Sequence, residues 1–299
     1  MRKIFPDRRV LMIGLLCVLA ACQPRPVPPE TGAGPAAAES GPDRAQRWWV
    51  PVHPYADQAA GFLLETMLYR PSGAGPFPLV TINHGVPGDK RFLRTTEPAF
   101  QAAAHWWVAQ GFAVAVPLRR GVGRSQGDFA EATESCSADD FVRVAYVAAA
   151  DMRGVVQYFA TQPFIDPHRM VIVGNSVGGV GALAVAADPP AGVAAVINFS
   201  GGIGGYGQDR LCGGPDGLIG LARQLGLRAK LPTLWLYAAN DHWFGAVARS
   251  MFDAYVTATT QPARFVPLPP FGEEGHATLY RADPAVWGEP VSAFLATVR

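Results

Sequence analysis

Met170-Val-Ile-Val-Gly-Asn-Ser176-Val-Gly-Gly179 is the stretch that decides the fold. It starts as a short apolar run rich in β-branched residues, typical of a buried strand, and passes through a Gly-x-Ser-x-Gly turn into an Ala-rich segment. Glycines beside the serine leave room for a sharp strand-to-helix turn that exposes the Ser176 hydroxyl. The turn also places the Val177 N–H at a helix start, where it can face a developing oxyanion. The stretch predicts a nucleophile elbow, although by itself it could also be a glycine-rich connection without chemistry.

Buried strands alternate with amphipathic helices from Phe77 onward, which predicts an α/β fold with a mostly parallel central sheet and helices on both faces. Two segments before it, Trp48–Tyr55 and Gly61–Tyr69, are expected to form antiparallel strands at the start of the domain. The chain between Phe199 and Leu231 has room for one loop and one short helix. We therefore expect no large lid domain and a rather open site.

Two further residues can complete a catalytic triad, because a serine needs a base, and the base needs an acceptor that holds its tautomer. Asp241 follows a predicted strand, and His276 lies in the loop after the last strand. Each alone could be a helix cap or a solvated loop residue. Together they give the chain order Ser, Asp, His at three strand ends, where ligands of such sheets gather. His242 is a rival base, but neighbouring side chains at a strand end point apart, so we rank it below His276.

From about Trp48 to its end, the chain resembles the α/β-hydrolase superfamily, in particular its dienelactone-hydrolase-like and prolyl-oligopeptidase-like serine hydrolases. The motifs that carry the resemblance are specific for the fold and the triad but not for a substrate. They are His84-Gly-Val-Pro87, Arg120-Gly-Val-Gly-Arg-Ser125, Asp166-Pro-His-Arg169, Val173-Gly-Asn-Ser-Val-Gly-Gly179, Asp241 and His276.

This resemblance implies that Val86, at the variable position of the His-Gly-x-Pro loop, offers the second oxyanion N–H beside Val177. It implies an enzyme that cleaves carboxylic esters of small molecules through an acyl-enzyme on Ser176, without a cofactor. A peptidase or amidase of the prolyl-oligopeptidase-like type is the alternative, and a catalytically silent binding lipoprotein is a third possibility. No cluster of His, Cys and carboxylates has metal-ligand spacing, so no metal site is expected.

The segment Gly202-Ile-Gly-Gly-Tyr-Gly207 matches the Gly-x-Gly-x-x-Gly pattern of dinucleotide sites and follows a predicted strand. No helix opens directly after Gly207, and no acidic residue stands about 20 positions later at a second strand end. We therefore expect a loop beside the active site, with Tyr206 and Trp243 as candidate pocket residues.

The first residues resemble the signal peptide of a bacterial lipoprotein. Residues 1–21 combine a basic start with an apolar run too short to span a bilayer, and Leu19-Ala-Ala-Cys22 is similar to a lipobox. The alternative is an ordinary cleavage site that happens to lie near Cys22. A lipidated Cys22 would anchor the protein to a membrane of the cell envelope, and Gln23 favours the outer membrane. Residues 22–47, rich in Pro, Ala and Gly, are expected to be a disordered tether, leaving 48–299 as the catalytic domain.

The net charge and the cysteines indicate which partners and which covalent links to expect. The net charge is +1 and no basic stripe is present, so nucleic acid is not an expected partner. In an exported protein Cys136 and Cys212 would remain in an oxidising space, where they can form a disulfide or stay as two thiols that never meet. Their expected positions on two loops at the carboxyl edge of the sheet favour the disulfide.

Overall fold

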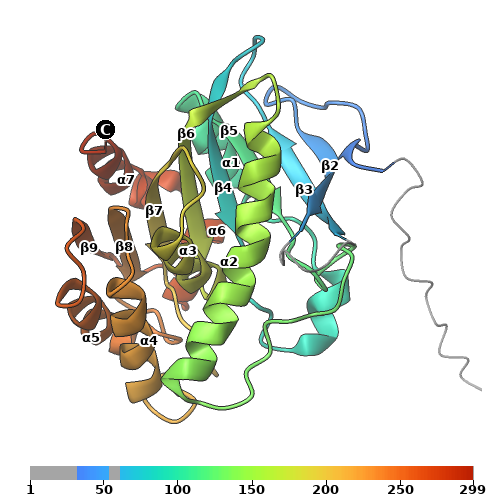
Figure 1. Ribbon diagram of the computed structural model, residues 1–299. Coiled ribbons are helices and arrows are strands. Elements are labelled where there is room, and N and C mark those ends of the chain that lie inside the picture. Colours follow the sequence, from blue (N-terminus) through green and yellow to red (C-terminus); the bar gives the residue numbers. More distant parts are fainter. Residues whose placement is uncertain (1–31, 54–60, 299) are drawn as a thin grey trace, which may run out of the picture.

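A nine-stranded, mostly parallel sheet forms the centre of the computed structural model, which describes residues 32–53 and 61–298 (Figure 1). The strand order is β1-β2-β3-β5-β4-β6-β7-β8-β9. Strands β4 to β9 run parallel to one another, whereas β1, β2 and β3 are antiparallel to their neighbours, as predicted. The strands are β1 (Gly34–Pro35), β2 (Gln46–Val52), β3 (Phe62–Tyr69), β4 (Phe77–Asn83), β5 (Ala113–Pro117), β6 (Ile165–Asn175), β7 (Val193–Phe199), β8 (Thr233–Ala238) and β9 (Ala263–Leu268).

Helices cover both faces of this sheet, which confirms the predicted fold class. One face packs against α2, α3, α4 and α5, and the other against α1, α6 and α7, so two apolar cores are separated by the sheet. The α-helices are α1 (Gln101–Ala109), α2 (Ala138–Ala160), α3 (Val177–Ala187), α4 (Asp216–Gly226), α5 (Gly245–Val256), α6 (Thr278–Arg281) and α7 (Gly288–Leu295). Short 3₁₀ turns lie at Lys90–Thr95, Gly275–Ala277 and Pro284–Val286.

Helix α3 lies between the sheet and α2 and is buried along its whole length. Small residues make this possible, since a Cβ added at Gly181 would lie 2.7 Å from the Met152 Cε of α2. A helix that is apolar on every side is stable only inside a core. The position of Ser176, directly before α3, is therefore fixed by packing on both sides of the helix.

The expected tether is shorter than predicted at its C-terminal end. Gly34 and Pro35 pair with Trp49 and Trp48, and β2 already begins at Gln46. The prediction that 22–47 is disordered is therefore wrong for residues 34–47, because backbone pairing orders a segment that buries little apolar surface. The predicted signal peptide, and Cys22 with it, lie outside the described residues.

Between β7 and β8 the chain forms a loop and α4, and no lid domain is inserted there. Within residues 32–53 and 61–298, none of the helices combines the length and hydrophobicity needed to cross a bilayer.

Candidate active site

Ser176 lies at the sharp turn between β6 and α3. Its backbone has φ 58° and ψ −125°, a conformation that residues other than glycine rarely adopt, and the residue is only 7% exposed. Glycines are required around it. A Cβ at Gly174 would lie 2.0 Å from the Gly178 carbonyl oxygen, and one at Gly178 would lie 2.3 Å from that of Asn83. The packing therefore explains why the Gly-x-Ser-x-Gly spacing is needed.

The loop after β4 lies against this serine, because a Cβ at Gly85 would be 2.7 Å from the Ser176 Cβ. Val86 follows directly and borders the same cavity as Ser176. Val177 is the first residue of α3, so its N–H has no acceptor within the helix. The two residues predicted to form the oxyanion hole thus both lie beside Ser176.

His84 holds this loop in place. Its Nε2 accepts a hydrogen bond of 3.0 Å from the Arg119 N–H, and its Nδ1 lies against the Gly85 carbonyl oxygen. Nε2 must therefore be unprotonated and Nδ1–H the donor. Burial, with the nearby Arg119 charge, lowers the pKa of His84 well below its ordinary value of 6.5. His84 is a neutral structural link between the loop that contains Gly85 and Val86 and the end of β5.

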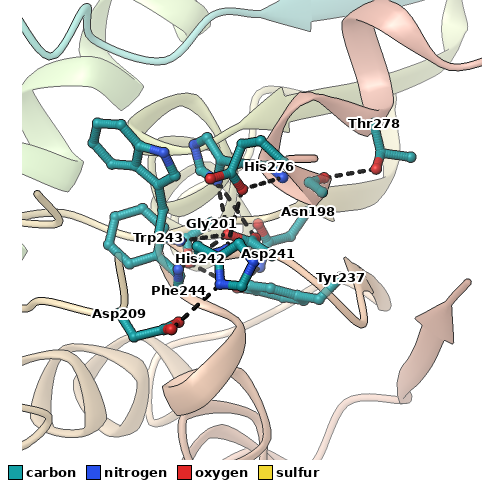
Figure 2. A network of polar contacts seen from close by, with 12 residues as sticks. Asn198, Gly201, Asp209, Tyr237, Asp241, His242, Trp243, Phe244, His276 and Thr278 are labelled. Atoms are coloured by element: carbon teal, nitrogen blue, oxygen red, sulfur yellow. Dashed lines mark hydrogen bonds and ion pairs between the residues drawn. The ribbon is translucent and has the colours of Figure 1, made fainter. Parts of the chain in front are cut away.

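Asp241 and His276 meet at the carboxyl ends of β8 and β9 (Figure 2). The His276 Nδ1 lies 3.2 Å from the Asp241 Oδ1 and 3.4 Å from its Oδ2. Burial alone would raise the pKa of Asp241, but the hydrogen bond and charge of His276 and the Phe244 N–H together hold it below its ordinary value. Asp241 is therefore ionised and orients His276, the role that a triad acid needs.

Ser176 and His276 border one cavity of about 350 Å³, so the three predicted residues share a site. Among the described residues the Ser176 hydroxyl has no hydrogen-bond partner. Catalytic hydrogen bonds are often long without substrate and tighten when it binds.

Two residues that the sequence did not single out connect the loops of the acid and the base. The Glu274 Oε1 accepts from the His242 N–H at 3.1 Å and from the His276 N–H at 3.0 Å. The side chain of Asn240 bonds the backbone of Phe271 and Gly272, residues that precede the His276 turn. A carboxylate two residues before the base was visible in the sequence, but nothing there indicated which N–H groups it would reach.

A buried polar network supports the site from below (Figure 2). The Tyr237 hydroxyl donates to the Gly201 carbonyl oxygen at 2.7 Å, and the Asn198 side chain contacts the same hydroxyl at 3.3 Å. Complete burial raises the pKa of Tyr237, which keeps the phenol protonated. Asn198 in turn lies under the elbow, where a Cβ at Gly179 would be 2.2 Å from its Oδ1. The network links β7 and β8 beneath the start of α3.

Ser176 also borders a second, smaller cavity of about 150 Å³. Of the two candidate pocket residues, Trp243 borders both cavities and Tyr206 borders the smaller one. The indole of Trp243 is stacked on the His276 ring and lies against Gly88 of the oxyanion loop. Tyr206 is 60% exposed at the rim of the smaller cavity.

His242, the rival base, points elsewhere. Its Nδ1 lies 3.3 Å from the Asp209 Oδ2, and it does not border either cavity at Ser176. The Asp209 N–H donates to the His242 carbonyl oxygen, so this pair ties down the loop that follows β7. That loop contains the Gly202–Gly207 segment, and the Gly202 N–H donates to the Ser176 carbonyl oxygen at 3.2 Å. The glycine pattern serves close packing at the active site.

Cys136 and Cys212 form a disulfide, with their Cα atoms 5.3 Å apart. Cys136 precedes α2, and Cys212 lies in the loop between β7 and α4. Since both loops also border the smaller cavity, the disulfide joins two parts of its rim.

Comparison with known proteins agrees with this geometry. The model of the peptidase S15 family, described as X-Pro dipeptidyl-peptidase, matches residues 60–248, more than half of the chain. The chain therefore belongs to this family and is a serine hydrolase of the α/β-hydrolase type.

Individual relatives are more distant. The quorum-quenching protein AidA of Acinetobacter baumannii is 32% identical over 121 residues, which span 40% of this chain but only 34% of AidA. A dienelactone hydrolase from Anabaena variabilis has a TM-score of 0.52 at 19% identity, covering 85% of this chain and 99% of that one. Acetyl xylan esterase 1 from Thermoanaerobacterium has a TM-score of 0.58 at 16% identity, covering 90% and 88%. At such identities the two structures show the shared fold alone.

Proposed function

We propose that this serine hydrolase of the S15 family cleaves carboxylic esters through an acyl-enzyme. One observation carries the proposal: the strained Ser176 faces a cavity that it shares with His276, whose Nδ1 lies 3.2 Å from the Asp241 carboxylate. A serine at a helix start, a histidine and a buried acid are the groups that acyl transfer requires. The esterase and dienelactone hydrolase names of the structural neighbours agree with an ester substrate.

In this proposal His276 takes the proton of the Ser176 hydroxyl as its oxygen attacks the ester carbonyl carbon. The N–H groups of Val86 and Val177 stabilise the negative oxygen of the tetrahedral intermediate. The intermediate collapses, the bond to the alcohol oxygen breaks, and His276 gives its proton to that oxygen. Water then attacks the acyl-enzyme by the same route and releases the acid. Asp241 stays ionised throughout and stabilises the imidazolium.

A peptidase is the second candidate, because the family model takes its description from X-Pro dipeptidyl-peptidases. The two functions separate in one assay that compares a short aryl ester with an X-Pro anilide. We expect turnover of the ester and a much lower kcat/KM on the anilide. The reverse order would assign the protein to the peptidases.

Replacement of the nucleophile tests the site itself. Ser176→Ala should lower ester hydrolysis by about four orders of magnitude or more, because the covalent step is lost. Labelling by a fluorophosphonate probe should disappear in the same variant, while the circular dichroism spectrum stays that of the wild type. Hydrolysis that survives in Ser176→Ala would disprove the assigned nucleophile.

For the location of the enzyme we propose a bacterial lipoprotein that is cleaved before Cys22 and anchored in the cell envelope, with Gln23 favouring the outer membrane. The Cys136–Cys212 disulfide supports an oxidising compartment, where such bonds persist. Feeding cells a clickable fatty acid should label the full-length protein, and Cys22→Ala should remove the label and release the protein from membranes. Unchanged membrane association of Cys22→Ala would contradict this anchor.

A further inference from the structure

Two adjoining cavities border Ser176. The larger, of about 350 Å³, is also lined by His276, Tyr280 and Phe100. The smaller, of about 150 Å³, is lined by Val177 and by the loops that the disulfide joins. Ser176, Trp243 and the loop Val86–Gly88 border both, so Ser176 stands where two adjoining cavities meet.

We infer that the smaller cavity receives the acyl group and the larger one the alcohol, so that the enzyme prefers short acyl groups without a positive charge on ring-containing alcohols. This inference rests on the proposed ester hydrolysis. His276 must donate its proton to the departing alcohol oxygen, which therefore lies on the His276 side. Of the two cavities, only the larger is bordered by His276, and only the smaller by Val177. The acyl chain then extends away from His276.

The size of the smaller cavity limits the acyl group. An engineered cavity of about 150 Å³ in another protein holds one benzene molecule, so about six non-hydrogen atoms fit in this volume. Acetyl to butyryl groups stay within that limit, whereas an octanoyl chain or an X-Pro dipeptide exceeds it. Ile203 and Phe244, both buried, form part of the wall and restrict its expansion.

The charged residues at the smaller cavity also restrict the acyl group. Among the described residues that border the smaller cavity, Glu131 is the one carboxylate, and Arg119 holds it through both oxygens, with the Nη2 at 2.8 Å. Both side chains are buried, 0% and 1% exposed. A carboxylate so paired offers no partner to a substrate ammonium, since breaking a buried ion pair is costly. Lys90, an exposed residue of the same cavity, adds a positive charge, so the cavity disfavours an acyl group that carries an ammonium.

The alcohol side is larger, aromatic and acidic. Phe100, Trp243 and Tyr280 give it flat apolar surfaces, and Glu97 and Glu274 are its two carboxylates. No Lys or Arg is among the described residues that line it. Such walls favour an uncharged ring and disfavour an alcohol that carries a carboxylate.

Wild-type kinetics give the first test. From phenyl butyrate to phenyl octanoate we expect kcat/KM to fall by about tenfold or more, since a chain that does not fit loses binding in the transition state. From phenyl acetate to 2-naphthyl acetate it should stay equal or rise. 4-Carbamoylphenyl acetate should be cleaved about tenfold faster than the isosteric 4-carboxyphenyl acetate. A preference for octanoate, or for the carboxylate, would overturn the inference.

A matched pair of variants assigns each cavity. Ala132 borders only the smaller cavity and the exposed Ala99 only the larger. Ala132→Phe should lower the butyrate-to-acetate ratio of kcat/KM by about tenfold and leave the naphthyl-to-phenyl ratio unchanged. Ala99→Phe should lower the naphthyl-to-phenyl ratio and leave the butyrate-to-acetate ratio unchanged. Thr133→Trp, at an exposed position of the same small cavity, replaces Ala132→Phe if that variant does not fold.

Exchanged effects of the two variants would show that the acyl group occupies the larger cavity and would overturn the inference, as would equal effects on both ratios. Failure of the proposed function gives a different result. In that case the wild type would hydrolyse none of the esters and would not react with a fluorophosphonate.

Discussion

The indole of Trp243 is stacked on the imidazole of His276, with ring centroids 5.4 Å apart and an angle of 25° between the planes. The edge of the imidazole makes a polar contact, since the His276 Nδ1 is directed at Asp241. An aromatic face attracts a cation placed over it. In the proposed mechanism His276 is a cation while the tetrahedral intermediate forms and collapses, so the stacking would stabilise a state on the reaction path.

Trp243→Leu should therefore lower kcat by about threefold to thirtyfold, the range expected for a cation held against an indole. Trp243→Phe keeps an aromatic face and should lose less. Steady-state kinetics on phenyl acetate would measure both, with KM reporting the loss of cavity wall separately. Wild-type kcat in Trp243→Leu would show that the stacking has no part in catalysis.

Glu274 holds the base by its backbone. Glu274→Ala leaves the N–H groups of His242 and His276 without their acceptor, at a cost of about 1–3 kcal/mol in stability if they remain buried. Displacement of His276 should lower kcat by about 10- to 100-fold with little change in KM. Glu274→Gln retains an amide oxygen as acceptor and should recover most of kcat. Equal losses in both variants would mean that the negative charge, and not the hydrogen bonds, is what matters.

The sequence could predict those parts of the site that depend on residues close together in the chain. The glycines at 174 and 178 are needed because any Cβ there would collide with backbone, so their spacing reveals the turn around Ser176. Strand ends can be found from apolar runs, and the parallel sheet brings Asp241 and His276 to the same edge.

What the sequence could not predict depends on which loops meet in space. Glu274 and Asn240 each bond a partner in the neighbouring loop, about 31 or 32 positions away in the chain. Arg119 reaches His84 across 35 positions through a backbone N–H, a contact that no side-chain pattern reveals. The pairing of Gly34 with Trp49 was missed for the same reason, because backbone hydrogen bonds ordered a segment whose composition is typical of a tether.

The disulfide closes a segment with a sequence separation of 76 residues. By the chain-entropy relation, a loop of this length stabilises the fold by about 4 kcal/mol, so reduction should lower Tm by several degrees. The double variant Cys136→Ser/Cys212→Ser should show the lower Tm without reductant and no further shift with it. Thermal unfolding of the wild type with and without dithiothreitol measures the effect. Identical Tm values under the two conditions would contradict it.

His84 makes the stability of the enzyme depend on pH. In the fold its pKa lies well below 6.5, because the ring is buried beside Arg119, whereas in the unfolded chain it returns to about 6.5. Below pH 6.5 the unfolded state therefore binds one proton more than the folded state, and the free energy of unfolding falls by up to about 1.4 kcal/mol per pH unit. Above pH 6.5 this contribution is constant.

Urea unfolding of the wild type between pH 5 and pH 8 should show this slope, and His84→Gln should reduce it. The glutamine side chain has an oxygen that can accept from the Arg119 N–H in place of Nε2, but it does not titrate. Other groups, such as Asp241, whose pKa is lowered, act at more acidic pH and remain in both proteins. The difference between the slopes of the two curves thus isolates the titration of His84: it should grow as the pH falls below 6.5 and vanish at pH 8. Parallel curves would mean that the His84 ring is protonated in the folded enzyme, and the loop that carries Val86 would then be held in another way.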